Sequence, residues 1–178
     1  MNKKLIAFAL IASSISAVQA ADGTINFTGN VLDTACTVDT ASASQTVALG
    51  NVNKSAFSAA GSTSGATRFT ITLSGCPTSY NNATVKFDGT ANSTNSNLLA
   101  LNSDATATGL GVALYEADGS TLIPLTSATK NITLVTNGSD TDATKGATAT
   151  YVAKYMSTAA AVGAGTANAA TNFTVSYN

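Results

Sequence analysis

The end of the chain constrains the fold more than any other part of the sequence. Residues 173–178 read Phe-Thr-Val-Ser-Tyr-Asn, so Phe173, Val175 and Tyr177 alternate with polar residues. This alternation is typical of a β-strand with one buried face. No turn or closing strand follows it, and we therefore expect a sheet edge that lacks a partner within the chain. Because an unpaired edge of this kind recruits strands from other chains, the pattern indicates a protein that polymerises by exchanging strands.

A second alternating run lies near the beginning of the chain. Ile25, Phe27, Gly29 and Val31 stand at offsets of two, so they project from the same side of an extended strand. We interpret this run as a donor strand whose apolar side chains fill a groove in another subunit, with Gly29 where that groove is shallow. The alternative is an ordinary first strand of a complete domain.

Residues 1–20 have the features of a secretory signal peptide. Lys3 and Lys4 precede an apolar stretch at residues 5–15, and small residues lie just before Ala21. The stretch is shorter than the about 20 apolar residues that a membrane span needs. We therefore divide the chain into a signal peptide (1–20), an N-terminal donor-strand extension (21–32) and a single domain (33–178).

The composition argues against catalysis and against binding to nucleic acid. The formal net charge is −1, only 10% of the residues are charged, and the chain has no His and no Trp. A weakly acidic chain has no electrostatic attraction to nucleic acid, and without His a serine or cysteine triad lacks its base. Asp140 and Asp142 are too few for a calcium loop, and residues 109–111 lack the spacing of a phosphate loop. We expect no cofactor, no metal and no enzymatic activity.

Two cysteines, Cys36 and Cys76, occur in a chain that we expect to be exported. In an oxidising compartment such a pair forms a disulfide by default. Closing a loop of this length stabilises the fold by about 4 kcal/mol in the loop-entropy treatment. The sequence therefore predicts a structural disulfide.

Between these features the chain shows short strands separated by turns. Asp118-Gly119 predicts a hairpin between two of them, residues 54–57 predict a brief helical turn, and residues 159–170 are small and predict a flexible segment. Many short strands with turns between them indicate an all-β sandwich. The expected strands cover residues 35–38, 46–49, 68–74, 84–88, 111–115, 121–123, 131–135, 149–155 and 173–178.

Together these features resemble the chaperone–usher pilins, the subunits of type 1-like bacterial fimbriae. The resemblance covers the whole chain, including the opening ADGTINFTGNVLDTAC and the strand FTITLSGC that ends at Cys76. Its most specific part is the end, with penultimate Tyr177, with Phe173 and Val175 on the same face, and with Gly165 as the fourteenth residue counted from Asn178.

The resemblance implies an immunoglobulin-like sandwich that lacks its last strand and is completed by a donor strand from a neighbouring subunit. It implies that a periplasmic chaperone first lends a strand beside Gly165, Phe173, Val175 and Tyr177. An outer-membrane usher then replaces that strand with the N-terminal extension of the next subunit. The partners would be identical or related pilins, the chaperone and the usher, with a tip adhesin at a distance. The chain would be exported through the periplasm to a fimbria on the cell surface that supports adhesion.

Two alternatives remain open from the sequence. The first is a self-complete secreted β-sandwich that binds carbohydrate, although the absence of Trp argues against it. The second is a minor adaptor pilin of the same family instead of the abundant shaft subunit, and the low charge favours the shaft. A two-domain tip adhesin does not fit, because the chain has no room for a second domain.

Overall fold

The computed structural model describes residues 25–29, 35–137 and 143–178. The chain divides into two units, Met1–Leu32 and Asp33–Asn178. In the first unit the described residues 25–29 are neither helix nor strand. The predicted signal peptide, Val31 and the pair Asp140 and Asp142 lie outside the described residues.

The second unit is built almost entirely of antiparallel strands. Two short helical elements, α1 (Thr40–Ala43) and η1 (Lys54–Ala56), lie between the first two strands. The strands in its described part are β1 (Thr37–Val38), β2 (Thr63–Cys76), β3 (Asn82–Asp88), β4 (Leu110–Glu116), β5 (Leu122–Ile123), β6 (Ile132–Thr133), β7 (Val135–Asn137), β8 (Thr144–Ser157) and β9 (Asn172–Tyr177).

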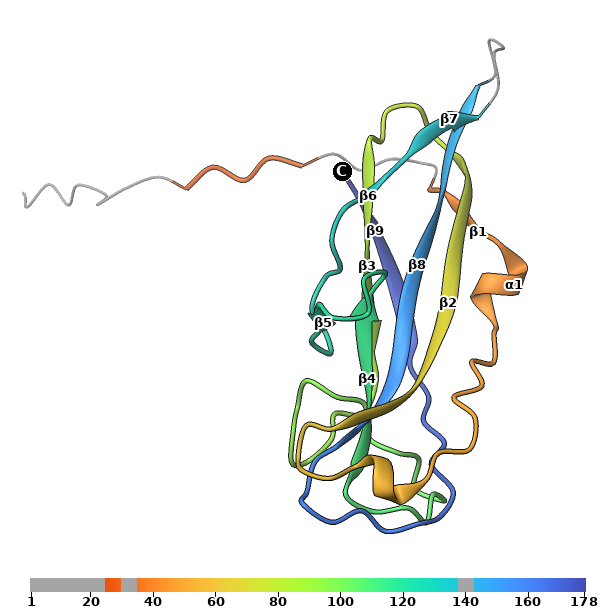
Figure 1. The fold of residues 1–178 in the computed structure, drawn as a ribbon. Coiled ribbons are helices and arrows are strands. Elements are labelled where there is room, and N and C mark those ends of the chain that lie inside the picture. The colour runs from red at the N-terminus through yellow and green to blue at the C-terminus, as the bar shows by residue number, and fades with distance from the viewer. Residues whose placement is uncertain (1–24, 30–34, 138–142) are drawn as a thin grey trace, which may run out of the picture. The chain divides into compact units, whose positions relative to one another are not determined.

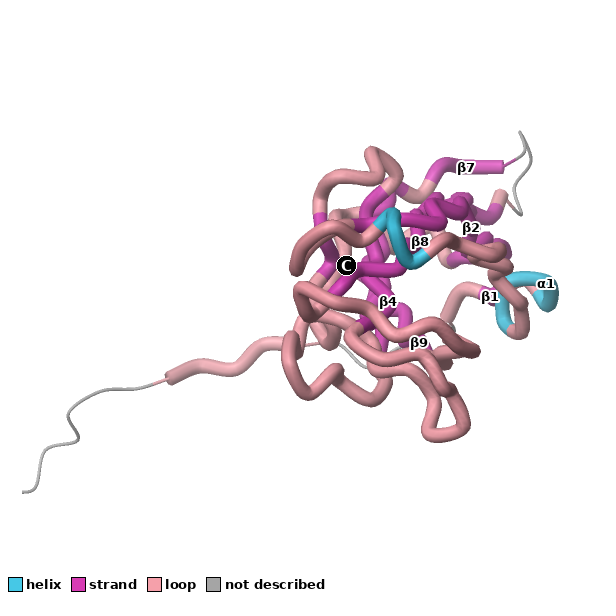
Figure 2. Tube along the Cα trace, turned by 60° about the horizontal axis from the view of Figure 1, so that its bottom comes forward, coloured by secondary structure: helices cyan, strands magenta, loops and turns pink. Residues whose placement is uncertain are grey.

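These strands form two sheets (Figure 1). The larger sheet has the order β1-β2-β8-β4-β5, with β7 also paired to β8, and the smaller sheet has the order β6-β3-β9. The helical turn α1 lies beside β1 and β2, at the edge of the larger sheet (Figure 2). Both sheets are open, so the predicted all-β, incomplete immunoglobulin-like sandwich is confirmed.

The core lies between the sheets and follows the alternation of the long strands. Ile71 and Leu73 of β2 are buried, whereas the residues on either side of Ile71 are more exposed. An aromatic cluster joins the sheets: the rings of Phe69 and Tyr151 in the larger sheet lie 6.1 and 5.3 Å from the ring of Phe87 in the smaller one. Edge-to-face aromatic pairs of this kind stabilise a core beyond the area that they bury.

Several elements differ from the sequence predictions. The strand predicted at residues 46–49 is wrong, because these residues form no ladder with a neighbouring strand. The turn α1 was not predicted; it begins after Asp39, whose side chain accepts a hydrogen bond from the Ala41 N–H (2.8 Å). The helical turn η1 and the hairpin that joins β4 to β5 are confirmed.

Candidate strand-acceptor groove

The C-terminal strand β9 has one paired edge and one open edge. It pairs antiparallel with β3, with Val85 opposite Val175 and Phe87 opposite Phe173. Among the described residues no second strand pairs with β9. Asn172, Thr174 and Ser176 are exposed, whereas Phe173, Val175 and Tyr177 are half-buried and pack against the core.

The phase of the β3–β9 ladder decides which backbone groups face the open edge. Asn82 and Asn178 each donate a backbone N–H to the other's carbonyl oxygen, at 2.9 and 3.0 Å. Since hydrogen-bonded and non-hydrogen-bonded pairs alternate along an antiparallel ladder, Val85 and Val175 form a non-hydrogen-bonded pair. Val85 instead bonds to Thr129 on its other side: its N–H donates to Thr129 Oγ1 (3.0 Å) and its carbonyl accepts from the Thr129 N–H (2.8 Å).

It follows that the N–H and C=O groups of Phe173, Val175 and Tyr177 point away from β3 and toward the open edge. Backbone groups in this position are strong hydrogen-bonding groups that need a partner. The half-buried side chains of the same three residues reach the core. The open edge is therefore ready to pair with one more strand.

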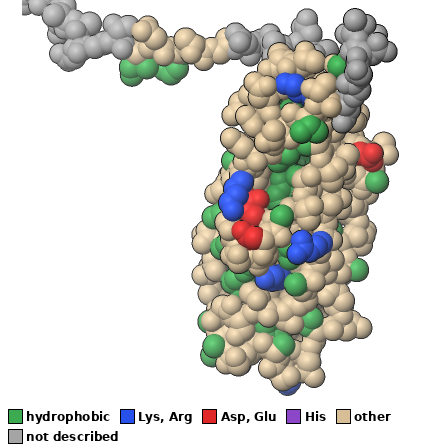
Figure 3. All heavy atoms as spheres, turned by 45° about the horizontal axis from the view of Figure 1, so that its top comes forward, with side chains coloured by type: hydrophobic (Ala, Val, Ile, Leu, Met, Phe, Trp, Pro, Cys, Tyr) green, Lys and Arg blue, Asp and Glu red, His purple; other side chains and the backbone are tan. Residues whose placement is uncertain are grey.

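A groove with a volume of about 1100 Å³ lies beside the first two residues of β9, Asn172 and Phe173. Its lining contains no Lys, Arg, Asp or Glu among the described residues. The space-filling view also shows only small, separate charged areas on one face of the molecule (Figure 3). Residues in the groove come from both sheets and from two connecting segments: Val38, residues 42–51, Phe69, Ile71, Phe87, Leu99, Val112, Leu114, Ala153, Tyr155 and residues 167–173.

One wall of the groove is the extended segment, residues 45–51. Val47 and Leu49 are half-buried against the core, whereas Thr46, Ala48 and Gly50 are exposed. Side-chain bonds attach the segment to β2: Gln45 Nε2 donates to the Thr70 carbonyl (3.0 Å), and Thr67 Oγ1 donates to the Ala48 carbonyl (3.0 Å). The residues alternate as in a strand, but hydroxyl and amide side chains supply the bonds that a ladder would supply.

A second wall of the groove is formed by residues 167–171 of the strap, which we define as residues 163–171. It was predicted to be flexible, yet it is held by hydrogen bonds to the loop at residues 102–108. The Tyr155 hydroxyl also donates to the Ala167 carbonyl (3.0 Å). The strap leads directly into β9, so the groove continues past the start of the strand.

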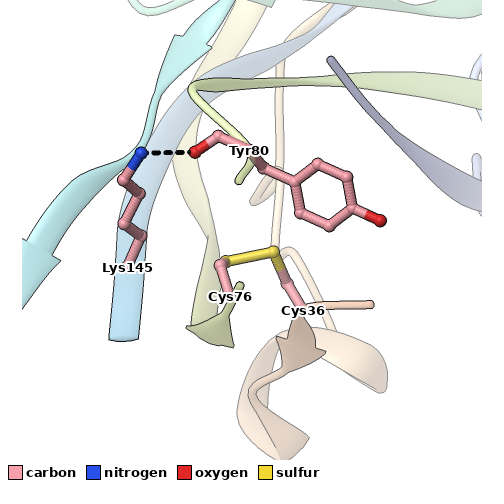
Figure 4. Close-up of a disulfide and its surroundings, with 4 residues drawn as sticks. All are labelled: Cys36, Cys76, Tyr80 and Lys145. Atoms are coloured by element: carbon pink, nitrogen blue, oxygen red, sulfur yellow. Dashed lines mark hydrogen bonds between the residues drawn. A yellow bond between two sulfur atoms is a disulfide. The ribbon is translucent and has the colours of Figure 1, made fainter. Parts of the chain in front are cut away.

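The disulfide lies at one end of the β9 edge. Cys36, just before β1, is bonded to Cys76 at the end of β2, with their Cα atoms 4.1 Å apart, so the predicted disulfide is confirmed. Figure 4 shows Tyr80 near this disulfide, with the Lys145 ammonium on its backbone carbonyl at 2.7 Å. The Tyr80 ring stacks on the Tyr177 ring with centroids 5.1 Å apart.

Burial is the largest cause of a raised pKa at the Tyr177 hydroxyl, and the neighbouring Tyr80 raises that pKa further. A hydrogen bond with the backbone of Cys36 acts in the opposite direction. Tyr177 thus connects the end of β9 to the disulfide and to the loop that precedes β3.

The structure brings together some of the residues predicted for the site. Phe173, Val175 and Tyr177 share the open edge of β9, and Phe173 also lines the groove. Gly165 lies in the strap, outside β9. In the first unit, the side chains of Ile25 and Phe27 are 80% and 91% exposed. Nothing lies within 4 Å of the position that a Gly29 Cβ would take. The roles of these residues in strand exchange stay predictions.

The two groove walls were missed as functional elements by sequence reasoning. The strap has no hydrophobic period that would predict a fixed wall, and the extended segment was predicted as an ordinary strand.

In the described ranges no group of three or more Asp, Glu, Cys or His residues could hold a metal ion. Within those same ranges, no helix is long and apolar enough to cross a membrane.

Comparisons with known proteins agree with this architecture. The family model described as "Fimbrial protein" matches residues 25–178. A probable major fimbrial subunit, LpfA of Escherichia coli, is 35% identical over 97% of this chain and 93% of its own length. The fimbrial subunit type 1 of Salmonella typhimurium is 36% identical over 97% and 91%.

Solved structures are similar as well. A type I fimbria protein and antigen of Burkholderia pseudomallei is 33% identical, with a TM-score of 0.58 over 82% of this chain and 91% of that one. The P pilus rod subunit PapA, at 21% identity, shares the fold with a TM-score of 0.60 over 80% of this chain and 99% of that one.

The open sandwich and these matches define a structural subunit of a surface fimbria. The chain belongs to the fimbrial protein family, which confirms the resemblance found in the sequence. The relatives reported are named as fimbrial subunits and not as enzymes. The alternative of a self-complete carbohydrate-binding sandwich is not favoured.

Proposed function

We propose that this chain is a rod subunit that polymerises by donor-strand exchange, in which residues 21–32 of one copy complete the groove of another. One observation carries the proposal: the outward backbone groups of β9 lie along one open edge, and an uncharged groove lies beside the start of that edge, at Asn172 and Phe173. The same chain carries Ile25 and Phe27 with their apolar side chains almost fully exposed. An exposed apolar segment and an uncharged groove beside an open strand edge are complementary in chemistry.

The energetics favour such an exchange. Burying Ile25, Phe27 and Val31 contributes roughly 1.5–3 kcal/mol for each side chain. Pairing with β9 adds backbone hydrogen bonds of about 0.5–1.5 kcal/mol each. Because the groove lining is uncharged, no buried charge has to be desolvated when the donor strand enters.

Before assembly the groove needs a temporary occupant. We propose that a periplasmic chaperone supplies a strand beside Phe173, Val175 and Tyr177, and that an outer-membrane usher exchanges it for the next subunit's extension. The route passes through the periplasm, where the Cys36–Cys76 disulfide can form. A tip adhesin would stand at the far end of the filament and would not contact most copies.

The rod role is favoured over the adaptor role by the names of its relatives. A relative that covers nearly the whole chain is named a probable major fimbrial subunit. A major subunit must both donate and accept a strand. The chain contains a candidate donor at residues 21–32 and a candidate acceptor in the groove, so each copy can have two neighbours.

The test uses the full mature chain and compares two neighbouring substitutions. Phe27→Glu places a charge on the groove-facing side of the donor, whereas Thr28→Glu places the same charge on its opposite side. We expect wild type and Thr28→Glu to form polymers in size-exclusion chromatography and electron microscopy, and Phe27→Glu to stay monomeric. We also expect the Phe27→Glu monomer to bind a synthetic peptide of residues 21–34. Polymers of equal length from all three chains would refute the proposal.

A further inference from the structure

The strap is fixed to the rest of the domain by an unusual group of hydrogen bonds at Thr106, Ala107 and Thr166, which we call the threonine clasp. The Thr106 N–H donates to both the carbonyl and the Oγ1 of Thr166, at 3.1 and 3.0 Å. The Ala107 N–H donates to the same carbonyl (3.0 Å), and the Thr166 N–H donates to Thr106 Oγ1 (2.9 Å). The two hydroxyl oxygens lie 3.2 Å apart.

The clasp needs a glycine beside it. A Cβ at Gly165 would clash with Thr106 Oγ1 and would lie 2.5 Å from the Ala107 nitrogen and the Thr106 carbonyl carbon. Two of these atoms belong to the backbone, so no side-chain rotation relieves the contact. The φ angle of Gly165 is not in the left-handed region. Close approach, and not conformational freedom, therefore requires glycine at this position.

The clasp also determines what the strap can offer to a bound strand. The carbonyl of Thr166 is used by the clasp, that of Ala167 accepts from the Tyr155 hydroxyl (3.0 Å), and that of Asn168 accepts from the Asn102 N–H (2.7 Å). These groups are not available for a ladder. Residues 167–171 nevertheless line the groove, so they can pack against a bound strand.

We propose that the threonine clasp holds the strap as a preformed wall that packs against one end of the donated strand. The clasp is thus a specificity-determining element. It raises the affinity of the groove for donor strands that are long enough to extend past β9 and contact the strap. This inference rests on the proposed strand exchange and goes beyond it. A preformed wall strengthens binding because the wall is already ordered when the donor arrives.

The experiment uses the full chain carrying Phe27→Glu, so that the groove accepts a strand and the chain does not polymerise. In one variant Gly165→Ala is added to force the clasp apart. In another, Thr166→Val removes the Thr166 hydroxyl from the clasp with little change in side-chain volume. Ala164→Ser is the matched control, since Ala164 is an exposed neighbour in the same strap. The probes are three synthetic peptides: residues 21–34, residues 26–34 and residues 21–29. Dissociation constants are measured by isothermal titration calorimetry.

We expect Gly165→Ala to weaken binding of the 21–34 peptide about tenfold, equivalent to roughly one or two hydrogen bonds. Thr166→Val should have a smaller effect in the same direction, and Ala164→Ser none. The two short peptides, residues 26–34 and residues 21–29, lack opposite ends of the donor, so one of them lacks the end that contacts the strap. The affinity of that peptide should be the same with and without the two clasp substitutions. A general loss of stability cannot produce this dependence on peptide length.

An equal loss of affinity for all three peptides, or no loss for the 21–34 peptide with either clasp substitution, would overturn the clasp inference and leave strand exchange standing. Failure of every peptide to bind the Phe27→Glu chain with an intact clasp would overturn the proposed strand exchange, and the clasp inference with it. If Gly165→Ala prevents folding, Thr166→Val alone gives the same comparison.

Discussion

Proline substitutions in β9 can separate folding of the subunit from strand acceptance. The backbone N–H of Val175 points to the open edge, whereas that of Thr174 bonds to β3, because Lys86 and Thr174 form a hydrogen-bonded pair. Proline removes the N–H and is tolerated on edge strands where that N–H faces outward. Val175→Pro should therefore keep the β3–β9 ladder and impair acceptance of a donor strand, and Thr174→Pro should break the ladder itself.

The expected size of the effect follows from one missing hydrogen bond. With Val175→Pro, a carbonyl of the donor strand is buried without its partner, which costs about 1–3 kcal/mol. A value of about 2 kcal/mol corresponds to a dissociation constant about 30-fold higher. Thr174→Pro removes a bond that the folded subunit already has, so a similar free energy is lost from folding.

Both substitutions are made in the full chain carrying Phe27→Glu, and a third chain carries Val175→Ala to measure the loss of the valine methyl groups alone. Binding of the 21–34 peptide is followed by calorimetry, and unfolding of the peptide-free chain by urea titration. We expect Val175→Pro to bind much more weakly than Val175→Ala while unfolding at nearly the same urea concentration. If Val175→Pro binds as tightly as Val175→Ala, the assignment of outward-facing groups is wrong.

Four further predictions concern other parts of the molecule. Gly29→Leu in the donor peptide should slow its binding to the groove and weaken the binding free energy by about 1–3 kcal/mol through overpacking. Equal binding rates for the wild-type and the substituted peptide would show that Gly29 has no role in the exchange. Replacing Cys36 and Cys76 with Ala should remove about 2–5 kcal/mol of stability and lower the periplasmic yield, and unchanged yield would contradict this. Thr126→Gly should raise the free energy of unfolding, measured by urea titration, by about 1 kcal/mol. Thr126 has a φ of 68°, a left-handed conformation that is strained for threonine and not for glycine. Because burial raises the pKa of Tyr177, this residue contributes stability that is fully present below the ordinary tyrosine pKa and is lost as the pH rises through the raised value. Tyr177→Phe should therefore reduce the fall in melting temperature at alkaline pH.

The sequence predicted the strands in which buried and exposed side chains alternate along the chain. Phe173, Val175 and Tyr177 alternate because one face of β9 packs on the core, and Phe69, Ile71 and Leu73 alternate in β2 for the same reason. The disulfide followed from the cysteine count and the expected compartment. These inferences need only local pattern and chemistry.

The groove walls could not be predicted in this way. Residues 46–49 alternate like a strand, yet whether a strand forms depends on a partner, and the segment is attached to β2 by side chains such as Thr67. The strap is rich in Ala, Gly, Thr and Asn, and its position depends on contacts between Thr106 and Thr166, which are 60 residues apart. No local pattern encodes a contact over that distance.

The central pair of strands has a consequence for the speed of folding. β2 and β8 form the longest ladder of the sandwich, and the bonded hydroxyls of Thr72 and Thr148 on them are 76 residues apart. Folds dominated by such distant contacts form slowly, on the scale of milliseconds to seconds, because a long loop must close before the contacts stabilise it. During that interval both long strands have exposed backbone and apolar side chains, which makes a newly exported chain prone to aggregate. A factor that shields these strands would therefore raise the yield of the subunit before any question of filament assembly arises.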